Sequence, residues 1–67
     1  MKIVLNGKTE KIENIRTIKD LIDKLGDSLP KFFAVEKNKE IIYKENYANC
    51  VLSENDEVEI VIFAGGG

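Results

Sequence analysis

The stretch of sequence that decides the fold is residues 57–67, which read EVEIVIFAGGG. Its first seven residues alternate acidic side chains with branched or aromatic apolar ones, as in a β-strand whose successive side chains point to opposite faces of a sheet. This segment is the most apolar of the candidate strands on both of its faces, so we expect it to be central in the sheet. The two predicted faces are Val58, Ile60 and Ile62 on one side and Glu57, Glu59, Val61 and Phe63 on the other.

A glycine-rich segment follows this strand: Ala64, Gly65, Gly66 and Gly67. Glycine buries no side chain and loses the most backbone freedom when it becomes ordered, so the three glycines cannot add to the stability of a fold. We therefore predict a folded domain over residues 1–63 and a flexible C-terminal glycine tail over residues 64–67. The predicted working group is the carboxylate of Gly67, and an inert, disordered end is the alternative that the glycines alone leave open.

The composition excludes most kinds of site within this chain. Its 67 residues include one cysteine and no histidine, so neither an internal disulfide nor a zinc site of the usual Cys/His kind is expected. The sequence has no Ser–His or Cys–His pair for nucleophilic catalysis, and no glycine loop that leads into a phosphate-binding helix. We therefore expect no enzyme activity, no bound cofactor and no metal, and we interpret Cys50 as a small buried apolar residue.

The distribution of charge favours a protein partner. Residues 1–33 carry seven Lys or Arg against five Asp or Glu, whereas residues 34–67 carry three against seven. An acidic surface repels nucleic-acid phosphates and attracts a basic protein, although a merely solvated acidic face is the alternative. No long apolar run is present, so we expect no signal peptide, no membrane binding and a reducing, cytoplasmic setting.

The N-terminal residues predict a β-hairpin. Residues 1–5 alternate in polarity, and Asn6-Gly7 follow them. This dipeptide is the strongest short hairpin signal, because both central residues of a type I′ turn have positive φ. Residues 8–13 then form the returning strand, which we expect to be polar and at the edge of the sheet.

A short amphipathic helix is predicted over residues 18–25. Thr17 is its expected N-cap, Asp20 supplies the carboxylate of a capping box, and Gly26 ends it. So short a helix is not stable alone in water and must pack its apolar stripe on the sheet. That stripe consists of Ile18, Leu21, Ile22 and Leu25.

Two further strands are predicted before the last one, over residues 32–37 and 40–43, with a turn at Asn38-Lys39 between them and a helical turn over residues 44–47 after them. One helix can cover only one face of a sheet, so the other face stays open. An exposed apolar patch beside the tail would mark a docking surface, with ordinary apolar surface as the alternative. The predicted docking residues are Val61, Phe63, Phe32, Ala34, Glu57 and Glu59.

Several segments together resemble the ThiS family of sulfur carrier proteins. They are Asn6-Gly7-Lys8, the helix from Thr17 to Leu25, residues 34–42 (AVEKNKEII), Tyr47, residues 56–61 (DEVEIV) and the terminal glycines. The likeness extends over essentially the whole chain. It implies an α+β, β-grasp (ubiquitin-like) fold, with a mixed sheet of four to five strands and one main helix packed on one face.

The resemblance also implies how other proteins would act on this chain. A ThiF-like, E1-type adenylyltransferase would use ATP to adenylate the carboxylate of Gly67. A cysteine desulfurase or another persulfide donor would supply sulfur to convert that group to a thiocarboxylate. A thiazole synthase of the ThiG type would then accept the sulfur in thiamine biosynthesis. Many family members end in two glycines and this chain ends in three, so Gly66 would carry the sulfur if the third glycine is not native.

The residues before Gly67 have a role that follows from their size. Ala64, Gly65 and Gly66 have small side chains or none, so they can thread a narrow channel of a partner's active site. Three alternatives remain at this point: a MoaD-type sulfur carrier for molybdopterin synthesis, a ubiquitin-like protein modifier, and a plain interaction domain with an inert tail.

Overall fold

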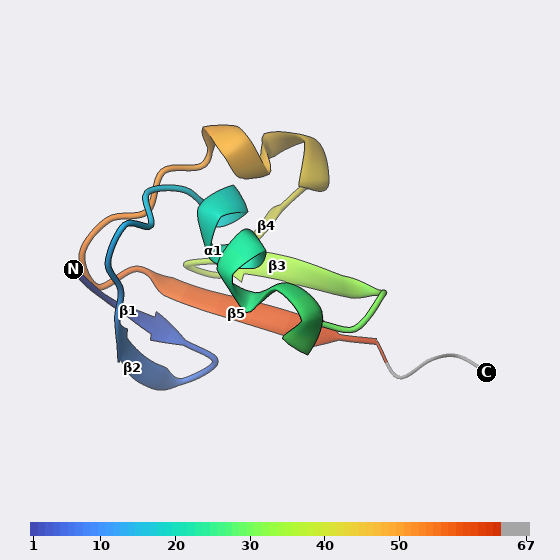
Figure 1. Cartoon of the computed structure of the whole chain (residues 1–67), viewed down its shortest axis with the longest axis horizontal. Coiled ribbons are helices and arrows are strands. Elements are labelled where there is room, and N and C mark those ends of the chain that lie inside the picture. Colours follow the sequence, from blue (N-terminus) through green and yellow to red (C-terminus); the bar gives the residue numbers. More distant parts are fainter. Residues whose placement is uncertain (64–67) are drawn as a thin grey trace.

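A computed structural model describes residues 1–63 of the chain, and the tail predicted for residues 64–67 lies outside the described residues. Five strands form one mixed sheet in the order β2-β1-β5-β3-β4, and helix α1 packs on one face of it (Figure 1). This architecture confirms the predicted fold class, with five strands and one main helix. The elements are β1 (Lys2–Leu5), β2 (Lys8–Lys11), α1 (Ile18–Leu25), η1 (Gly26–Ser28), β3 (Phe33–Lys37), β4 (Glu40–Ile42), η2 (Lys44–Asn49) and β5 (Glu57–Ile62).

Strand β5 occupies the centre of the sheet, as its apolar pattern predicted. It runs parallel to β1, with Leu5 opposite Val58, and antiparallel to β3, with Val35 opposite Ile60. The parallel neighbour is the first strand of the chain and the antiparallel neighbour is the third. The last strand therefore joins the N-terminal hairpin to the β3–β4 hairpin.

Both predicted hairpin turns are confirmed by their backbone conformation. Asn6 and Gly7 have φ values of 51° and 81°, and Asn38 and Lys39 have values of 52° and 70°. Type I′ turns require positive φ at both central positions, and asparagine and glycine adopt it at little cost. The returning strand β2 lies at the edge of the sheet, as expected, but it ends at Lys11 and not at Glu13.

The start and end of α1 agree with the predicted caps. The Thr17 hydroxyl accepts a hydrogen bond from the Asp20 amide at 3.1 Å, and the Asp20 carboxylate accepts one from the Thr17 amide at 3.1 Å. A further bond from the Arg16 amide, at 2.9 Å, reaches the same carboxylate. These backbone donors, Arg16 first, lower the pKa of Asp20 below its ordinary value. Gly26 closes the helix with a positive φ of 45°.

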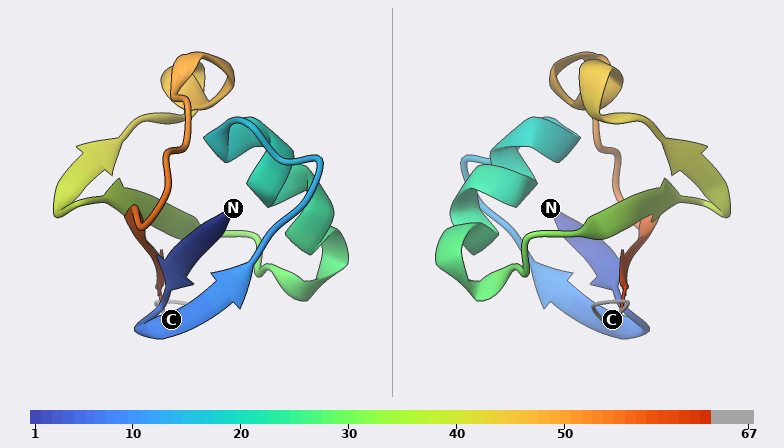
Figure 2. Two further views of the ribbon diagram at one scale, coloured as in Figure 1. Left: turned by 90° about the vertical axis from the view of Figure 1, so that its left-hand side faces the viewer. Right: turned by 90° about the vertical axis from the view of Figure 1, so that its right-hand side faces the viewer.

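The core lies between α1 and the sheet face that the helix covers (Figure 2). Ile18 and Leu21 of the predicted stripe are buried, whereas Ile22 and Leu25 are partly buried at its margin. Three buried residues come from connecting segments and were not assigned to the core from the sequence, because no periodic apolar pattern marks them. They are Ile12, Ile15 and Leu52.

One residue of the predicted core face of β5 is not buried. Val58 and Ile60 are buried, but Ile62 is 59% exposed. The alternation along the strand is correct, yet β5 continues past the elements that cover the sheet (Figure 1). Shared orientation therefore does not ensure burial at the end of a strand.

Candidate functional site

The sheet face opposite α1 carries an apolar row at the end where β5 stops. Ala34 and Val61 lie directly opposite each other in the β3–β5 ladder, and both are half-buried. Phe32 and Phe63 flank the ladder just outside the two strands, and they are 63% and 56% exposed. Ala34 and Val61 thus lie at one end of the open face, and Phe32 and Phe63 are exposed directly beyond the same end of the two strands; we call these four residues the apolar row.

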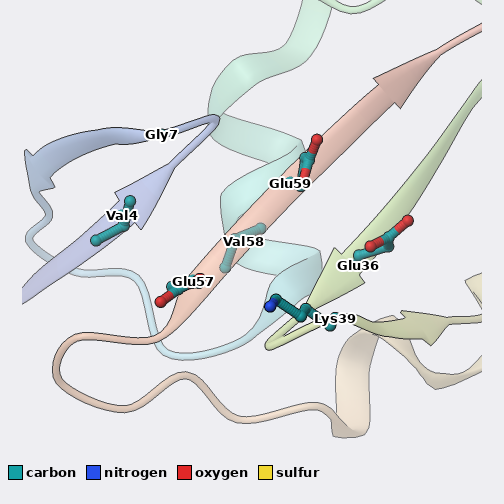
Figure 3. A pocket seen from close by; sticks show the side chains of 7 residues that line it. All are labelled: Val4, Gly7, Glu36, Lys39, Glu57, Val58 and Glu59. Atoms are coloured by element: carbon teal, nitrogen blue, oxygen red, sulfur yellow. The ribbon is translucent and has the colours of Figure 1, made fainter.

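Three carboxylates lie further back on the same face, over the middle of the sheet. Glu36 of β3 and Glu59 of β5 are direct cross-strand partners, and Glu57 of β5 is the partner of Val4 of β1. Together they border a shallow hollow of about 150 Å³ with Lys39 at its rim (Figure 3). The predicted docking residues Glu57 and Glu59 are exposed there, and Glu36 is an acidic member that the sequence prediction missed.

The opposition of Glu36 and Glu59 costs stability. Like charges placed directly opposite across two strands repel each other, whereas opposite charges or an apolar pair would stabilise the same position. Within residues 1–63 the ion pairs are Lys19 with Asp23 and Lys37 with Asp56, so neither of the facing glutamates takes part in one. Lys39, which lines the same hollow, is the basic side chain of this chain that lies beside these carboxylates.

A network of hydrogen bonds fixes the start of β5. Asn38, in the β3–β4 turn, donates through Nδ2 to Asp56 Oδ1 at 3.0 Å and accepts from the Glu57 amide at 2.9 Å. The other carboxylate oxygen of Asp56 accepts from the Ser53 amide at 2.8 Å and lies 3.8 Å from Lys37 Nζ. The sequence marked Asn38 only as a turn residue, because nothing local shows that its side chain reaches Asp56, 18 residues away.

The single thiol of the chain lies away from both the apolar row and the acidic hollow. Cys50 is half-buried, and it packs against the core cluster. Its carbonyl accepts a hydrogen bond from the Ile18 amide at 3.0 Å, which ties the segment after η2 to the start of α1. This placement fits the interpretation of Cys50 as a small apolar residue, although its burial is partial.

The predicted sulfur-carrying and threading residues, Ala64, Gly65, Gly66 and Gly67, lie outside the described residues. Among residues 1–63, no group of three or more His, Cys, Asp or Glu side chains is arranged to hold a metal ion. In the same part of the chain, no helix is both long enough and apolar enough to cross a membrane.

Comparison with known proteins places the chain in a family. The family model described as "ThiS family" matches residues 3–67 of the chain. The Bacillus subtilis protein named sulfur carrier protein ThiS is 45% identical over 64 residues, which are 94% of this chain and 96% of that protein.

Two longer relatives carry a different name. Proteins named thiazole synthase from Paramagnetospirillum magneticum and Magnetococcus marinus are 40% and 42% identical to this chain over 67 residues. The alignment includes all of this chain, which spans about a fifth of the length of each relative (20%). A segment similar to this chain is thus part of a longer polypeptide in both.

The fold agrees with a solved structure over the full length. The crystal structure of the thiamine biosynthesis protein ThiS from Geobacter metallireducens superposes with a TM-score of 0.82, at 26% identity and with 100% of both chains covered. A solution structure of the protein from the same organism gives a TM-score of 0.75 and covers 88% of that chain.

Proposed function

The chain belongs to the ThiS family, and on this basis we propose that it is a sulfur carrier protein of thiamine biosynthesis, with the carboxyl group of Gly67 as its sulfur-carrying end. In this role the chain is a co-substrate on which other enzymes act, and it performs no catalysis of its own. The observation that carries the proposal is the match of the family model over residues 3–67, together with 45% identity to a sulfur carrier of nearly the same length.

The proposed chemistry takes place on the carboxylate of Gly67. A carboxylate is a poor acyl donor, so an E1-type adenylyltransferase must first join it to AMP from ATP, with release of pyrophosphate. The terminal sulfur of a persulfide then attacks the acyl carbon, and AMP leaves. A thiol must cleave the resulting S–S bond by forming a disulfide, and this step frees the thiocarboxylate. The proposal therefore requires a free carboxyl group at Gly67 and a compartment that supplies thiols.

The arrangement of the open face supports docking of these enzymes where β5 ends. The apolar row of Phe32, Ala34, Val61 and Phe63 lies at this end, so a protein bound to the row would contact the last residues of the chain before position 64. The exposed phenylalanines can supply a large share of the binding energy, because a few anchor residues dominate interface energetics. Glu36, Glu57 and Glu59 would then favour a partner that has basic groups facing them and an apolar surface facing the row.

The acceptor of the sulfur is proposed to be a thiazole synthase of the ThiG type. Two relatives named thiazole synthase contain a segment similar to this chain, which favours that enzyme as partner. A physical link between carrier and acceptor raises the effective concentration of one for the other. The proteins that activate Gly67 and donate the persulfide are proposed from the family resemblance and from the chemistry: a ThiF-like adenylyltransferase and a cysteine desulfurase or a similar donor.

The experiment that tests the proposal is intact-mass spectrometry of the chain after incubation with ATP, an E1-type adenylyltransferase and a persulfide donor. We expect a gain equal to the exchange of one oxygen for sulfur, located on Gly67 by fragmentation. A covalent adduct with a lysine of another protein would instead indicate a modifier, and an unchanged mass would contradict the carrier function. Sulfur delivery to a molybdopterin precursor, and not to a thiazole synthase, would overturn the assignment to thiamine biosynthesis.

Two variants sharpen this experiment. Gly66→Val should block adenylation and leave the fold intact, because a branched side chain cannot thread a channel shaped for glycine. Cys50→Ser should leave the sulfur loading unchanged, because the sulfur is proposed to reside on the terminal carboxyl group. Loss of loading in a folded Cys50→Ser protein would show that the thiol takes part in the chemistry.

A further inference from the structure

The neighbouring strand β1 ends before β5 does, so the last residues of β5 have no strand beside them on that side. The parallel partner β1 stops at Leu5, and the chain then turns away through Asn6 and Gly7 into β2. Up to that point the ladder is regular: the Val4 amide donates to the Asp56 carbonyl at 2.8 Å, and the Asn6 amide donates to the Val58 carbonyl at 2.9 Å.

The next bond of this ladder is made by a side chain. In a regular parallel pair the Ile60 amide would donate to the main-chain carbonyl of Asn6. The φ of 51° at Asn6 belongs to a chain that is turning out of the strand direction, and its side-chain oxygen Oδ1 accepts from the Ile60 amide at 2.8 Å. Ile60 is only 7% exposed, so water has little access to take over this bond.

We propose that Asn6 is a positioning residue for the C-terminal arm of the carrier, by which we mean residues 61–67. The side chain of Asn6 adds one more hydrogen bond to the β1 side of β5 and so holds β5 in place at Ile60. Within residues 1–63 this is the most C-terminal hydrogen bond that β5 receives from that side. Beyond Ile60 the ladder continues on the other side, where Val61 and Ile62 lie opposite Ala34 and Phe33 of β3. The inference rests on the proposed function, since it concerns how the end of β5 is aimed at a partner.

The choice of asparagine at this position is not explained by the turn alone. Glycine adopts positive φ at least as readily, so Asn6→Gly would serve the type I′ turn equally well. What glycine lacks is the amide oxygen, which has the same acceptor chemistry as the peptide carbonyl that it replaces in the ladder. Aspartate keeps an acceptor oxygen and also tolerates this backbone region, so Asn6→Asp retains both features.

The consequence for function is a matter of preorganisation. A partner that threads the residues after β5 must bind an arm whose direction at Ile62 and Phe63 is already set. If the Asn6 bond is lost, the end of β5 is held by β3 alone, and more freedom must be removed when the arm binds. The loss should raise the KM for the carrier in adenylation and leave kcat unchanged, because the carboxylate and the enzyme groups that act on it are unaltered.

The test compares Asn6→Gly with two matched controls. Asn6→Asp keeps the acceptor oxygen. Asn14→Gly makes the same chemical change at an exposed asparagine with a φ of 60°, and so reproduces the effect of an added glycine on the unfolded chain. Amide hydrogen exchange at Ile60, Val61 and Ile62 and the adenylation kinetics are measured well below the unfolding temperature of every variant.

For Asn6→Gly we expect exchange at Ile60 to rise roughly tenfold or more, as for an amide that has lost its acceptor. The KM should rise about three- to tenfold with kcat unchanged. Both controls should stay within about twofold of the wild type in KM. A KM for Asn6→Gly equal to that of Asn14→Gly would overturn the positioning role, as would unchanged exchange at Ile60. Absence of adenylation of the wild type would overturn the proposed function itself, whereas a normal wild type with unaltered Asn6→Gly kinetics would overturn only this inference.

Discussion

The two faces of the sheet differ in the kind of residue pairs that they carry across neighbouring strands. On the face under α1, the directly paired residues Val35 and Ile60 are apolar and buried, and Val35 belongs to one core cluster with Ile3. On the open face, the pair one step along the same two strands is Glu36 opposite Glu59. Neighbouring positions of one ladder thus carry a buried apolar pair and a destabilising pair of like charges.

This difference indicates which face the fold depends on and which face another molecule would use. A domain of this size has a net stability of only about 3–5 kcal/mol without disulfides or metals, so one face must be packed well. A repulsive pair and exposed phenylalanines can be retained on the other face because the first face holds the structure together. The face that adds least to stability is therefore the better candidate for binding.

The largest effect is expected from breaking the packed face. Leu21→Ala removes a buried side chain from α1 but leaves a good helix former, so it tests packing alone. The free energy of unfolding should fall by about 3 kcal/mol, most of what a domain this small has. Urea denaturation followed by circular dichroism measures it, and a loss below about 1 kcal/mol would contradict the assignment of Leu21 to the core.

The next effect concerns the apolar row on the open face. Phe63→Ala should lower kcat/KM for adenylation about tenfold, because an exposed aromatic residue of this kind provides a central contact in an interface. The unfolding temperature should hardly change. Val51→Ala is the control, since Val51 is 54% exposed and lies outside the β3–β5 ladder, at the isolated bridge to Thr17. Equal losses for the two variants would argue against a docking surface at the row.

A smaller effect on stability is expected from the facing pair Glu36 and Glu59, and its control variant should change stability in the opposite direction. Glu36→Gln removes one of two facing charges and should raise stability by a few tenths of a kcal/mol at low salt. Glu40→Gln should lower it by a similar amount, because Glu40 lies directly opposite Lys37. High salt should remove both differences by screening. Adenylation should become less efficient in Glu36→Gln if a basic partner reads this carboxylate, in spite of the gain in stability.

The smallest effect is expected in the pH dependence of the stability, through Asp20 at the start of α1. Hydrogen bonds from the Arg16 and Thr17 amides hold the pKa of Asp20 below its unfolded-state value, so Asp20 stabilises the fold at pH values above the ordinary aspartate pKa. That contribution is lost as the pH falls from this value through the lower folded-state pKa. Asp20→Asn should flatten this part of the stability curve, as measured by thermal unfolding between pH 5 and pH 2. An unchanged acid slope in Asp20→Asn would show that other carboxylates account for it.

Elements with local signals could be predicted well. The capping box of Thr17 and Asp20, the two turns at Asn6-Gly7 and Asn38-Lys39, and the central place of β5 are all confirmed. Each depends on contacts within a few residues, or on a polarity pattern along one strand, and such information is present in a short window of sequence. The same pattern placed the docking residues on one face, although their role in binding stays a prediction.

The features that could not be predicted join residues far apart in the chain. Nothing in the sequence near Asn6 or Ile60 indicates a bond between them across 54 positions, and the register that sets Glu36 against Glu59 arises only when β3 pairs with β5. The burial of Ile12, Ile15 and Leu52 likewise depends on how the connections fold over the core. Polarity and turn chemistry act over a few residues and therefore specify which elements form and which way their side chains face. Register, loop burial and long-range hydrogen bonds depend on the simultaneous packing of all the elements, so they exist only in the assembled fold.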